Sequence, residues 1–188
     1  MIRRVSFCAD PFVCSPWRLV EASRMYKTFA HTADTGLQME ADDLNSLFVE
    51  AGRALFSLIV ANPEAIQPRV TRQITLPPSQ PDYMLVDWLN ELLFAFDKDR
   101  ILLWHFDVSI SPEGLRAMAG GEPYDAARHE LEHEVKAITY HELVVESRDG
   151  KWIATVIVDI QRWRFAYERS SLPAHDITES TVDAIGTV

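Results

Sequence analysis

Cysteine is scarce in this 188-residue sequence, which contains only Cys8 and Cys14. Both lie near the N-terminus, where they could form a disulfide or half of a metal site, although two free thiols are the simpler interpretation. No apolar run approaches the roughly 18 residues that a membrane-spanning helix requires. The residues after Arg3 and Arg4 are interrupted by charges and prolines, which is not typical of a signal peptide. We therefore expect a cytoplasmic protein.

Lysine and arginine are also less frequent than the acidic residues. The chain has 18 Lys and Arg residues against 28 Asp and Glu residues, and residues 26–160 have 11 against 22. Binding of nucleic acid depends on neutralising phosphates with Lys and Arg. We therefore expect no direct nucleic-acid binding, and a role in RNA metabolism would have to pass through a protein partner or a cation. The arginines at positions 162, 164 and 169 are a weak nucleic-acid signal.

Motifs for nucleotide binding and nucleophilic catalysis are missing as well. The chain contains no P-loop, no G-x-G-x-x-G, no G-x-S-x-G and no C-x-x-C. The string from His129 to His133 fits the H-E-x-x-H pattern of zinc proteases, which needs both histidines on one long helix and a third ligand. Because the string follows two glycines and leads directly into a predicted strand, we expect structural histidines.

Two helices are predicted from apolar residues at the i, i+3, i+4, i+7 spacing of one helix face. The first should start at a cap formed by Asp42 or Asp43 and end at Asn62-Pro63, with the apolar face Leu44, Leu47, Phe48, Ala51, Leu55 and Leu58. The second should start at the cap Asp82, with the apolar stripe Leu85, Trp88, Leu89, Leu92, Leu93 and Phe96 and the polar edge Asp87, Asn90 and Glu91.

Strands are predicted at residues 37–41, 70–76, 102–110 and 115–119, with a turn at residues 111–114. Residues 134–146 and 152–160 should form a β-hairpin around Asp149-Gly150, because a type I′ turn needs positive φ at both central positions. This turn pairs Arg148 with Lys151 and sets Asp159 opposite Tyr140. The elements together indicate an α+β fold, a mainly antiparallel sheet with two principal helices packed on one face.

Residues 26–160 are interpreted as one domain, since this length is enough to bury a proper core. Residues 1–25 resemble an N-terminal extension, either disordered or the product of a misassigned start, because they are rich in breakers of regular structure. Residues 161–188 are interpreted as a C-terminal extension.

Two aspartates are the strongest candidates for chemistry. Asp159 ends the run 153–158, which is apolar on both faces and typical of a central strand. A carboxylate there is solvated at a strand end, paired with a base or bound to a cation. Asp34 lies in a polar, turn-prone segment, where an Asp near a Gly is usually a turn residue. Nearby His31 is either a ligand or acid–base group, or a hydrogen-bonded structural histidine.

Lys136 lies in the first strand of the predicted hairpin and by alternation shares a face with Ile138 and Tyr140. In the register set by the turn, Lys136 lies four residues beyond the partner of Asp159, roughly 13 Å along the strand at ~3.3 Å per residue. A salt bridge between Lys136 and Asp159 would therefore need a bulge. A solvated or partner-facing lysine fits equally well.

Several segments, by their order and spacing, resemble the archease family over most of residues 26–160. They are YKTFAHTAD at 26–34, LF at 47–48, LVDWLNELL at 85–93, GE at 121–122, VKAITYH at 135–141 and VIVDI at 156–160. The resemblance implies a core related to strand–helix–strand–strand modules. It also implies a protein partner, an RtcB-type RNA ligase that joins RNA ends carrying a 3′-phosphate or 2′,3′-cyclic phosphate to 5′-hydroxyl ends in tRNA splicing or RNA repair.

Archeases are understood as activators, not enzymes, which promote guanylylation and multiple turnover of that GTP-dependent ligase. The resemblance implies a divalent-cation site at Asp34, Asp159 and the backbone carbonyl of Ile160, with Lys136 and His31 involved in activating the partner. We expect Ca²⁺ or Mg²⁺, because the ligands are hard oxygens and no cysteine belongs to the site.

Two departures from the family pattern concern this site and its surroundings. The family usually has an Asp at the position of Ala30, and its members commonly end near the Asp-Ile dipeptide, whereas this chain continues to Val188. Two alternatives remain open. One is a metal-dependent hydrolase that uses Asp34, Asp159 and His31. The other is a chaperone-like modulator of an RNA-modifying methyltransferase.

Overall fold

The computed structural model describes residues 25–31 and 34–162. Cys8, Cys14, the rest of residues 1–24 and most of the predicted C-terminal extension lie outside the described residues, so what was predicted for them stays a prediction. In the described part of the chain, neither helix is both long enough and apolar enough to cross a membrane.

The described chain forms two α-helices, a short 3-10 helix and seven strands. In chain order these are β1 (Tyr26–His31), β2 (Asp34–Ala41), α1 (Leu44–Ile59), η1 (Pro63–Ala65), β3 (Val70–Leu76), α2 (Pro81–Asp99), β4 (Ile101–Ser111), β5 (Gly114–Pro123), β6 (His133–Arg148) and β7 (Lys151–Arg162). The strands make a four-stranded sheet with the order β1-β2-β7-β6 and a three-stranded sheet with the order β3-β5-β4. All their pairings are antiparallel.

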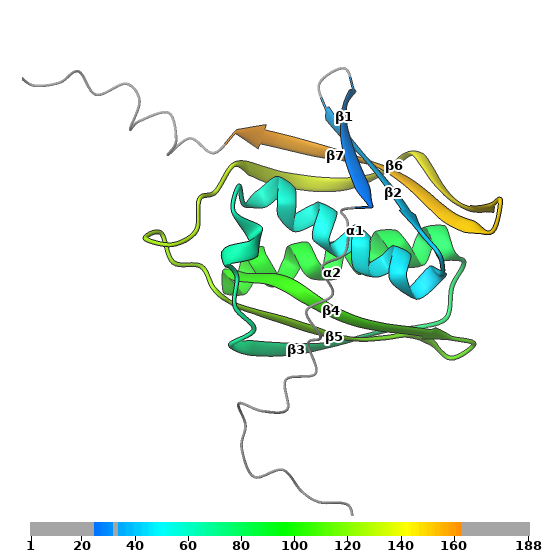
Figure 1. Cartoon of the computed structure of the whole chain (residues 1–188), viewed down its shortest axis with the longest axis horizontal. Helices are drawn as coiled ribbons and strands as arrows, with labels where there is room; N and C mark the ends of the chain where they lie inside the picture. The colour runs from blue at the N-terminus through cyan, green and yellow to red at the C-terminus, as the bar shows by residue number, and fades with distance from the viewer. Residues whose placement is uncertain (1–24, 32–33, 163–188) are drawn as a thin grey trace, which may run out of the picture.

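The two helices lie between the two sheets, so the molecule has three layers (Figure 1). Helix α1 packs on β2 and β4, and α2 packs on β6 and β4. The predicted α+β class is confirmed, but the helices are covered by a sheet on each side and do not pack on one face of a single sheet. The reason is visible in α1, which buries more of its circumference than one stripe: Leu47, Phe48, Glu50, Ala51, Gly52, Ala54, Leu55, Phe56, Leu58 and Ile59.

An aromatic cluster joins the two helices to the three-stranded sheet. The ring of Phe106 on β4 lies 5.8 Å, edge to face, from Trp88 on α2 and 6.4 Å from Phe56 on α1. The indole N–H of Trp88 donates to the carbonyl of Phe48 over 2.9 Å, so this buried polar group is satisfied. The core therefore fixes α1 against α2 and both helices against β4.

The helix ends differ in part from the prediction. Asp43 caps α1 as expected, accepting from the N–H of Ser46 over 2.9 Å, and this hydrogen bond lowers the pKa of Asp43. Helix α1 ends at Ile59, before Asn62-Pro63. Helix α2 is capped by Gln80 without a side-chain hydrogen bond, and Asp82 lies in its first turn. Pro81 sets this start, because its fixed φ and missing N–H suit the first helical position.

Three of the predicted strands flank α2 in sequence. Residues 70–76 form β3 as predicted, while β4 and β5 extend beyond the predicted 102–110 and 115–119. The tight connection between β4 and β5 is closed by Gly114 with φ 117°, which suits glycine. The order β3, α2, β4, β5 is a strand–helix–strand–strand unit, as the resemblance implied.

The β6–β7 hairpin forms around the predicted turn, but its register shifts twice. Asp149 and Gly150 have φ 54° and 79°, and Arg148 pairs with Lys151 as predicted. Between Thr139 and Val144, β6 contains three more residues than the facing part of β7. As a result Asp159 pairs with Ala137. The prediction of Tyr140 as its partner is wrong, because a register counted from the turn assumes a regular ladder and β6 contains bulges.

Candidate functional site

The register of the four-stranded sheet brings the predicted site residues into one row. His31 on β1 pairs with Asp34 on β2, and Asp159 on β7 pairs with Ala137 on β6. Between β2 and β7 the last pair is Thr35 with Val158, and continuing this register by one residue sets Asp34 opposite Asp159. Residues His31, Asp34, Asp159 and Ala137 thus occupy one line across the sheet, which we call the acidic row. In this continued register, two aspartates separated by more than 120 residues in sequence become neighbours.

Lys136 lies beside the acidic row, at the second shift of the β6 register between Val135 and Ala137. It is therefore one residue from the partner of Asp159, not the four that the turn register predicted. The shared face predicted for Lys136 and Ile138 is also wrong. Ile138 is buried in the core while Lys136 is exposed, because an extra residue in a strand reverses the alternation of side chains. None of the ion pairs in the described residues joins Lys136 to Asp159.

Asp159 is half-buried at the point where the apolar part of β7 ends. Its neighbour Val158 is fully buried, and Ile160 packs against the core two positions past the end of the β2 pairing. No side chain among those the structure describes forms an ion pair with Asp159. The side chains of His31 and Asp34 lie outside the description. Among the described residues, no group of three or more His, Cys, Asp or Glu side chains gathers to hold a metal ion.

The outer face of the sheet next to the acidic row is apolar. Phe29 pairs with Gly36, which pairs in turn with Ile157, and Ile157 is almost fully buried although it lies outside the main core. A Cβ at Gly36 would collide with the ring of Phe29. Glycine is therefore needed here for the close approach of an aromatic ring, two residue pairs away from the two aspartates.

The H-E-x-x-H string does not form a zinc-protease site, because it lies in a turn and the start of β6 and not on a helix. His129 is buried, and its Nδ1 accepts from the N–H of Asp125 over 3.0 Å. Its Nε2 therefore carries the proton and lies 3.3 Å from a carboxylate oxygen of Glu122. His133 is directed elsewhere, with Nδ1 3.2 Å from the carbonyl of Leu58. Both histidines have structural partners, as expected.

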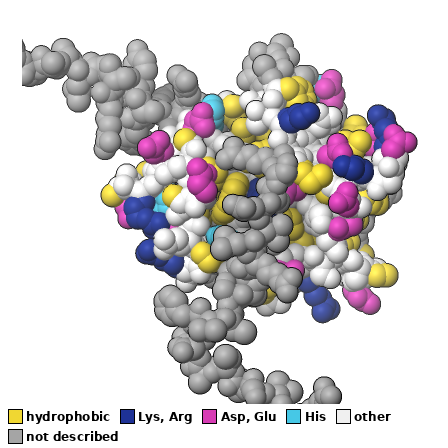
Figure 2. Space-filling view, viewed as in Figure 1, with side chains coloured by type: hydrophobic (Ala, Val, Ile, Leu, Met, Phe, Trp, Pro, Cys, Tyr) yellow, Lys and Arg dark blue, Asp and Glu magenta, His cyan; other side chains and the backbone are white. Residues whose placement is uncertain are grey.

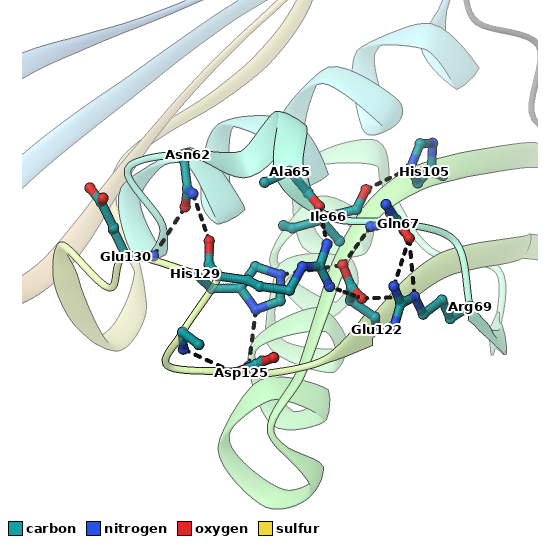
Figure 3. Close-up of polar contacts among 12 residues, drawn as sticks. Asn62, Ala65, Ile66, Gln67, Arg69, His105, Glu122, Asp125, His129 and Glu130 are labelled. Carbon is teal, nitrogen blue, oxygen red and sulfur yellow. Dashed lines mark hydrogen bonds and ion pairs between the residues drawn. The ribbon is translucent and has the colours of Figure 1, made fainter.

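Glu122 is the centre of a buried ionic network that the sequence analysis did not identify (Figure 3). The side chain is 2% exposed and receives Arg128 Nη1 at 2.6 Å, the N–H of Gln67 at 2.8 Å and Arg69 Nε at 3.2 Å. Burial alone would raise the pKa of Glu122. The hydrogen bonds from Arg128, Gln67 and His129 outweigh burial and hold its pKa at about 2. The sequence signals were the GE pair at 121–122 in the archease resemblance and an acidic residue near the end of a mostly apolar strand.

The Glu122 network joins three segments that are distant in sequence. Arg128 also donates to the carbonyl of Ala65 over 2.9 Å, which connects the turn before β6 to η1. Asn62 accepts from the N–H of Glu130 over 3.0 Å and donates to the carbonyl of Arg128 over 2.8 Å (Figure 3). The network thereby fixes the segment that leads into β6, the strand that carries Lys136.

Two cavities of the described surface lie away from the acidic row. One of about 360 Å³ is lined by Met25, Lys27, Gln38, Met39, Glu40 and Ile153, none of which belongs to the row. Glu40, its acidic group, already forms an ion pair with Lys151 over 2.8 Å. On the face shown in Figure 2, Asp and Glu side chains lie over both ends of the molecule, with Lys and Arg interspersed.

Comparison with known proteins places this arrangement in context. The archease protein family matches the chain over residues 26–160. The archease of Methanopyrus kandleri is 38% identical over 149 residues, which span 77% of this chain and 99% of that protein. The solution structure of protein 1598 of Methanobacterium thermoautotrophicum aligns with TM-score 0.62 and 28% identity, covering 73% of this chain and 99% of that one.

A crystal structure from Thermotoga maritima, described as an archease and possible chaperone, has the same fold. It aligns with TM-score 0.53 and 20% identity, covering 71% of this chain and 95% of that one. Both solved structures share the architecture of two helices with mainly antiparallel sheets.

Proposed function

Because the chain belongs to the archease family, we propose that it is a non-catalytic, cation-binding activator of a GTP-dependent RtcB-type RNA ligase. In this role it promotes guanylylation of the ligase and supports its multiple turnover in tRNA splicing or RNA repair. The observation that supports the proposal is the β2–β7 register, which ends at Thr35 with Val158 and, continued by one residue, would set Asp34 opposite Asp159.

The acidic row has a donor set that suits a hard cation. Positions directly opposite each other in antiparallel strands have Cβ atoms about 4.5–5.5 Å apart. Two carboxylates at that spacing disfavour each other's ionised form, and a divalent cation relieves the repulsion. Asp34, Asp159 and the backbone carbonyl of Ile160 would supply oxygen ligands, which favours Ca²⁺ or Mg²⁺ over zinc. The absence of an ion pair to Asp159 from the described side chains supports a ligand from outside.

Ala30 bears on the strength of this site. It lies directly before His31 and pairs with Thr35, one position from the acidic row. The family usually has a further Asp at this position, so this chain has one carboxylate fewer near the cation. Because cation affinity rises with ligand charge, we expect weaker binding than in relatives that keep this Asp.

The charge of the protein supports action through a partner. A surface with twice as many acidic as basic residues between positions 26 and 160 repels an RNA backbone. Lys136 is exposed beside the acidic row and His31 belongs to the row, which supports the proposal that these two residues contact the ligase near the cation. We assign these two residues to partner activation and no residue to catalysis.

The test is ligation of RNA with 3′-phosphate and 5′-hydroxyl ends by the cognate ligase, at catalytic ligase and excess RNA. The wild-type protein should raise the number of turnovers, while Asp159→Asn and Lys136→Ala should not. The matched control is Asp107→Asn, which removes an exposed carboxylate from β4 in the other sheet and should stimulate like wild type. Full stimulation by Asp159→Asn would refute the role of the acidic row.

A chaperone-like modulator of an RNA-modifying methyltransferase is the second candidate, favoured by the description of the Thermotoga maritima structure as a possible chaperone. Affinity capture from the native cell distinguishes the two, since recovery of a ligase supports the proposal and recovery of a methyltransferase supports the alternative. A metal-dependent hydrolase would need turnover without a partner, and incubation with Mn²⁺ and phosphodiester substrates tests it.

A further inference from the structure

Helix α2 exposes a stripe of aromatic and acidic side chains. Tyr83 and Phe94 are each 52% exposed, the residues Asp87, Asn90 and Glu91 between them are also exposed, and the remaining residues from Tyr83 to Phe94 are buried. We call these five exposed residues the α2 stripe. Their spacing follows one face of a helix, and at 1.5 Å per residue the stripe is roughly 16 Å long. These side chains contribute little to the core, so the packing of α2 does not account for them.

A further exposed ring extends the α2 stripe onto β6. Tyr140 is 58% exposed, and its ring lies 6.1 Å from that of Tyr83. Tyr140 begins the stretch of β6 between Thr139 and Val144 in which the pairing with β7 is interrupted, and Glu142 in this stretch has φ 51°. Such irregularities redirect side chains out of the regular alternation of a strand. Two half-exposed tyrosines from different elements thus lie together, and exposed tyrosines of this kind are typical of the energetic centre of a protein interface.

The carboxylates of the α2 stripe give it a negative charge. Asp87 and Glu91 are one helical turn apart, a spacing at which like charges repel. None of the ion pairs in the described residues includes either carboxylate. One ring of the stripe already accommodates a cation, since Lys98 Nζ lies 5.3 Å from the centre of the Phe94 ring. The stripe therefore suits a positively charged side chain, and its carboxylates disfavour a phosphate backbone.

Arginine is the side chain that fits both the charge and the rings of the α2 stripe. Its guanidinium binds carboxylates through parallel hydrogen bonds and stacks on aromatic faces, whereas lysine presents a point charge. Residues four apart on a helix have Cβ atoms about 5–6 Å apart, so one guanidinium can contact both Asp87 and Glu91. Apolar side chains on either side of that arginine would then lie against Tyr83 and Phe94.

The α2 stripe is close enough to the acidic row for one partner protein to contact both. Tyr140 lies three residues along β6 from Ala137, which belongs to the row, or roughly 10 Å of strand. Strand β6 is also an edge strand of the four-stranded sheet, so an approaching protein can reach it. A standard interface covers about 800 Å² on each partner, which is enough to include both regions.

We propose that the α2 stripe, together with Tyr140, is a docking surface for an arginine-bearing segment of a protein partner. The inference rests on the proposed function for the identity of that partner, the RNA ligase. The two regions then have separate roles, because the α2 stripe provides affinity for the ligase and the acidic row provides its stimulation.

Titration of this protein into the ligation assay separates the two roles, because it yields both a half-maximal concentration and a maximal stimulation. The variant Asp87→Lys, Glu91→Lys should need at least ~10-fold more protein for half-maximal stimulation but reach the wild-type maximum. The control Asp107→Lys, Glu113→Lys makes the same change in charge at two exposed carboxylates of the β4–β5 hairpin and should behave like wild type. An α2 variant with the wild-type half-maximal concentration would overturn the docking surface and leave the proposed function standing. A wild-type protein without any stimulation would overturn both.

Photo-crosslinking identifies what occupies the α2 stripe. The photoreactive residue p-benzoylphenylalanine replaces Tyr83 in one protein and, in the control, Met118, which is exposed on β5 of the other sheet. With purified ligase, position 83 should crosslink to a ligase peptide that contains arginine, and position 118 should not. Replacing that ligase arginine with glutamate should restore the half-maximal concentration of the Asp87→Lys, Glu91→Lys variant. Crosslinks from position 83 to a second copy of this chain or to added RNA, in place of the ligase, would overturn the proposal.

Discussion

Two groups of acidic residues in this protein differ in what surrounds them. Glu122 is buried and receives two arginines, a histidine and a backbone N–H. Asp159 is half-exposed at a strand end, next in register to Asp34 and without an ion pair from the described side chains. A carboxylate whose oxygens are all occupied contributes to folding, whereas one left unpaired beside another carboxylate can take up a cation. The predictions below test this division, from the largest effect on stability to the smallest.

Removing the buried carboxylate should destabilise the protein most. Glu122→Ala leaves Arg128, the N–H of Gln67 and His129 without their shared acceptor, so we expect a loss of about 4 kcal/mol in the free energy of unfolding. Urea denaturation followed by circular dichroism measures it. Glu113→Ala, an exposed glutamate in the β4–β5 turn, is the control. A loss no larger than the control's would show that the network is not structural.

Acid should weaken the same network. The pKa of Glu122 is held at about 2 in the folded protein against 4.5 for an ordinary glutamate. A depressed pKa contributes stability that is fully present above pH 4.5 and is lost as pH falls toward 2, about 3 kcal/mol at ~1.4 kcal/mol per unit. Unfolding free energies of wild type and Glu122→Gln between pH 6 and pH 3 should converge. Parallel curves would contradict the assignment.

A substitution beside the acidic row should have a smaller effect. Gly36→Ala pushes a methyl group into the ring of Phe29, and because that ring is partly exposed and can move, we expect a loss of about 1 kcal/mol. Thermal unfolding of the single variant and of Gly36→Ala with Phe29→Ala measures it. The second substitution removes the collision, so the double variant should not show the sum of the two separate losses.

The smallest effect on stability is expected at the candidate cation site itself. Asp159→Asn keeps the shape of a side chain that has no ion pair in the described structure, so its free energy of unfolding in chelator should stay within about 0.5 kcal/mol of wild type. Chemical denaturation in EDTA measures this. A loss as large as that of Glu122→Ala would place Asp159 among the structural carboxylates and remove the contrast between the two regions.

The sequence predicted the parts of this molecule that depend on local pattern. The cap at Asp43, the strand at residues 70–76 and the turn at Asp149-Gly150 each follow from neighbouring residues, and all three are confirmed. The start of α2 was predicted at Asp82, because the weight of Pro81 at the first helical position was missed. The strands divide into two sheets because each helix is apolar around much of its circumference and needs a sheet on both sides. The sequence analysis considered only one apolar stripe on each helix and therefore predicted a single sheet.

For the candidate site, the sequence named residues but not their geometry, and the cation site stays a prediction. Asp34 and Asp159 were both singled out, but only the β2–β7 register, which ends at Thr35 with Val158, shows that the next position on each strand is an aspartate. The distance of Lys136 from Asp159 was wrong, because two bulges in β6 cannot be read from alternation alone. Glu122 was missed as a centre of charge, because its partners Arg69 and Arg128 lie 53 residues before it and six after it, and no local pattern links them.

Calorimetric titration with Ca²⁺ is the most direct test of the central claim that Asp34 and Asp159 together hold one cation. If they form a single site, Asp34→Asn and Asp159→Asn should each weaken binding at least ~10-fold, and the double variant should lose little more than either, because residues in one site are not additive. Binding in both single variants that equals wild type, or losses that simply add in the double variant, would contradict the account.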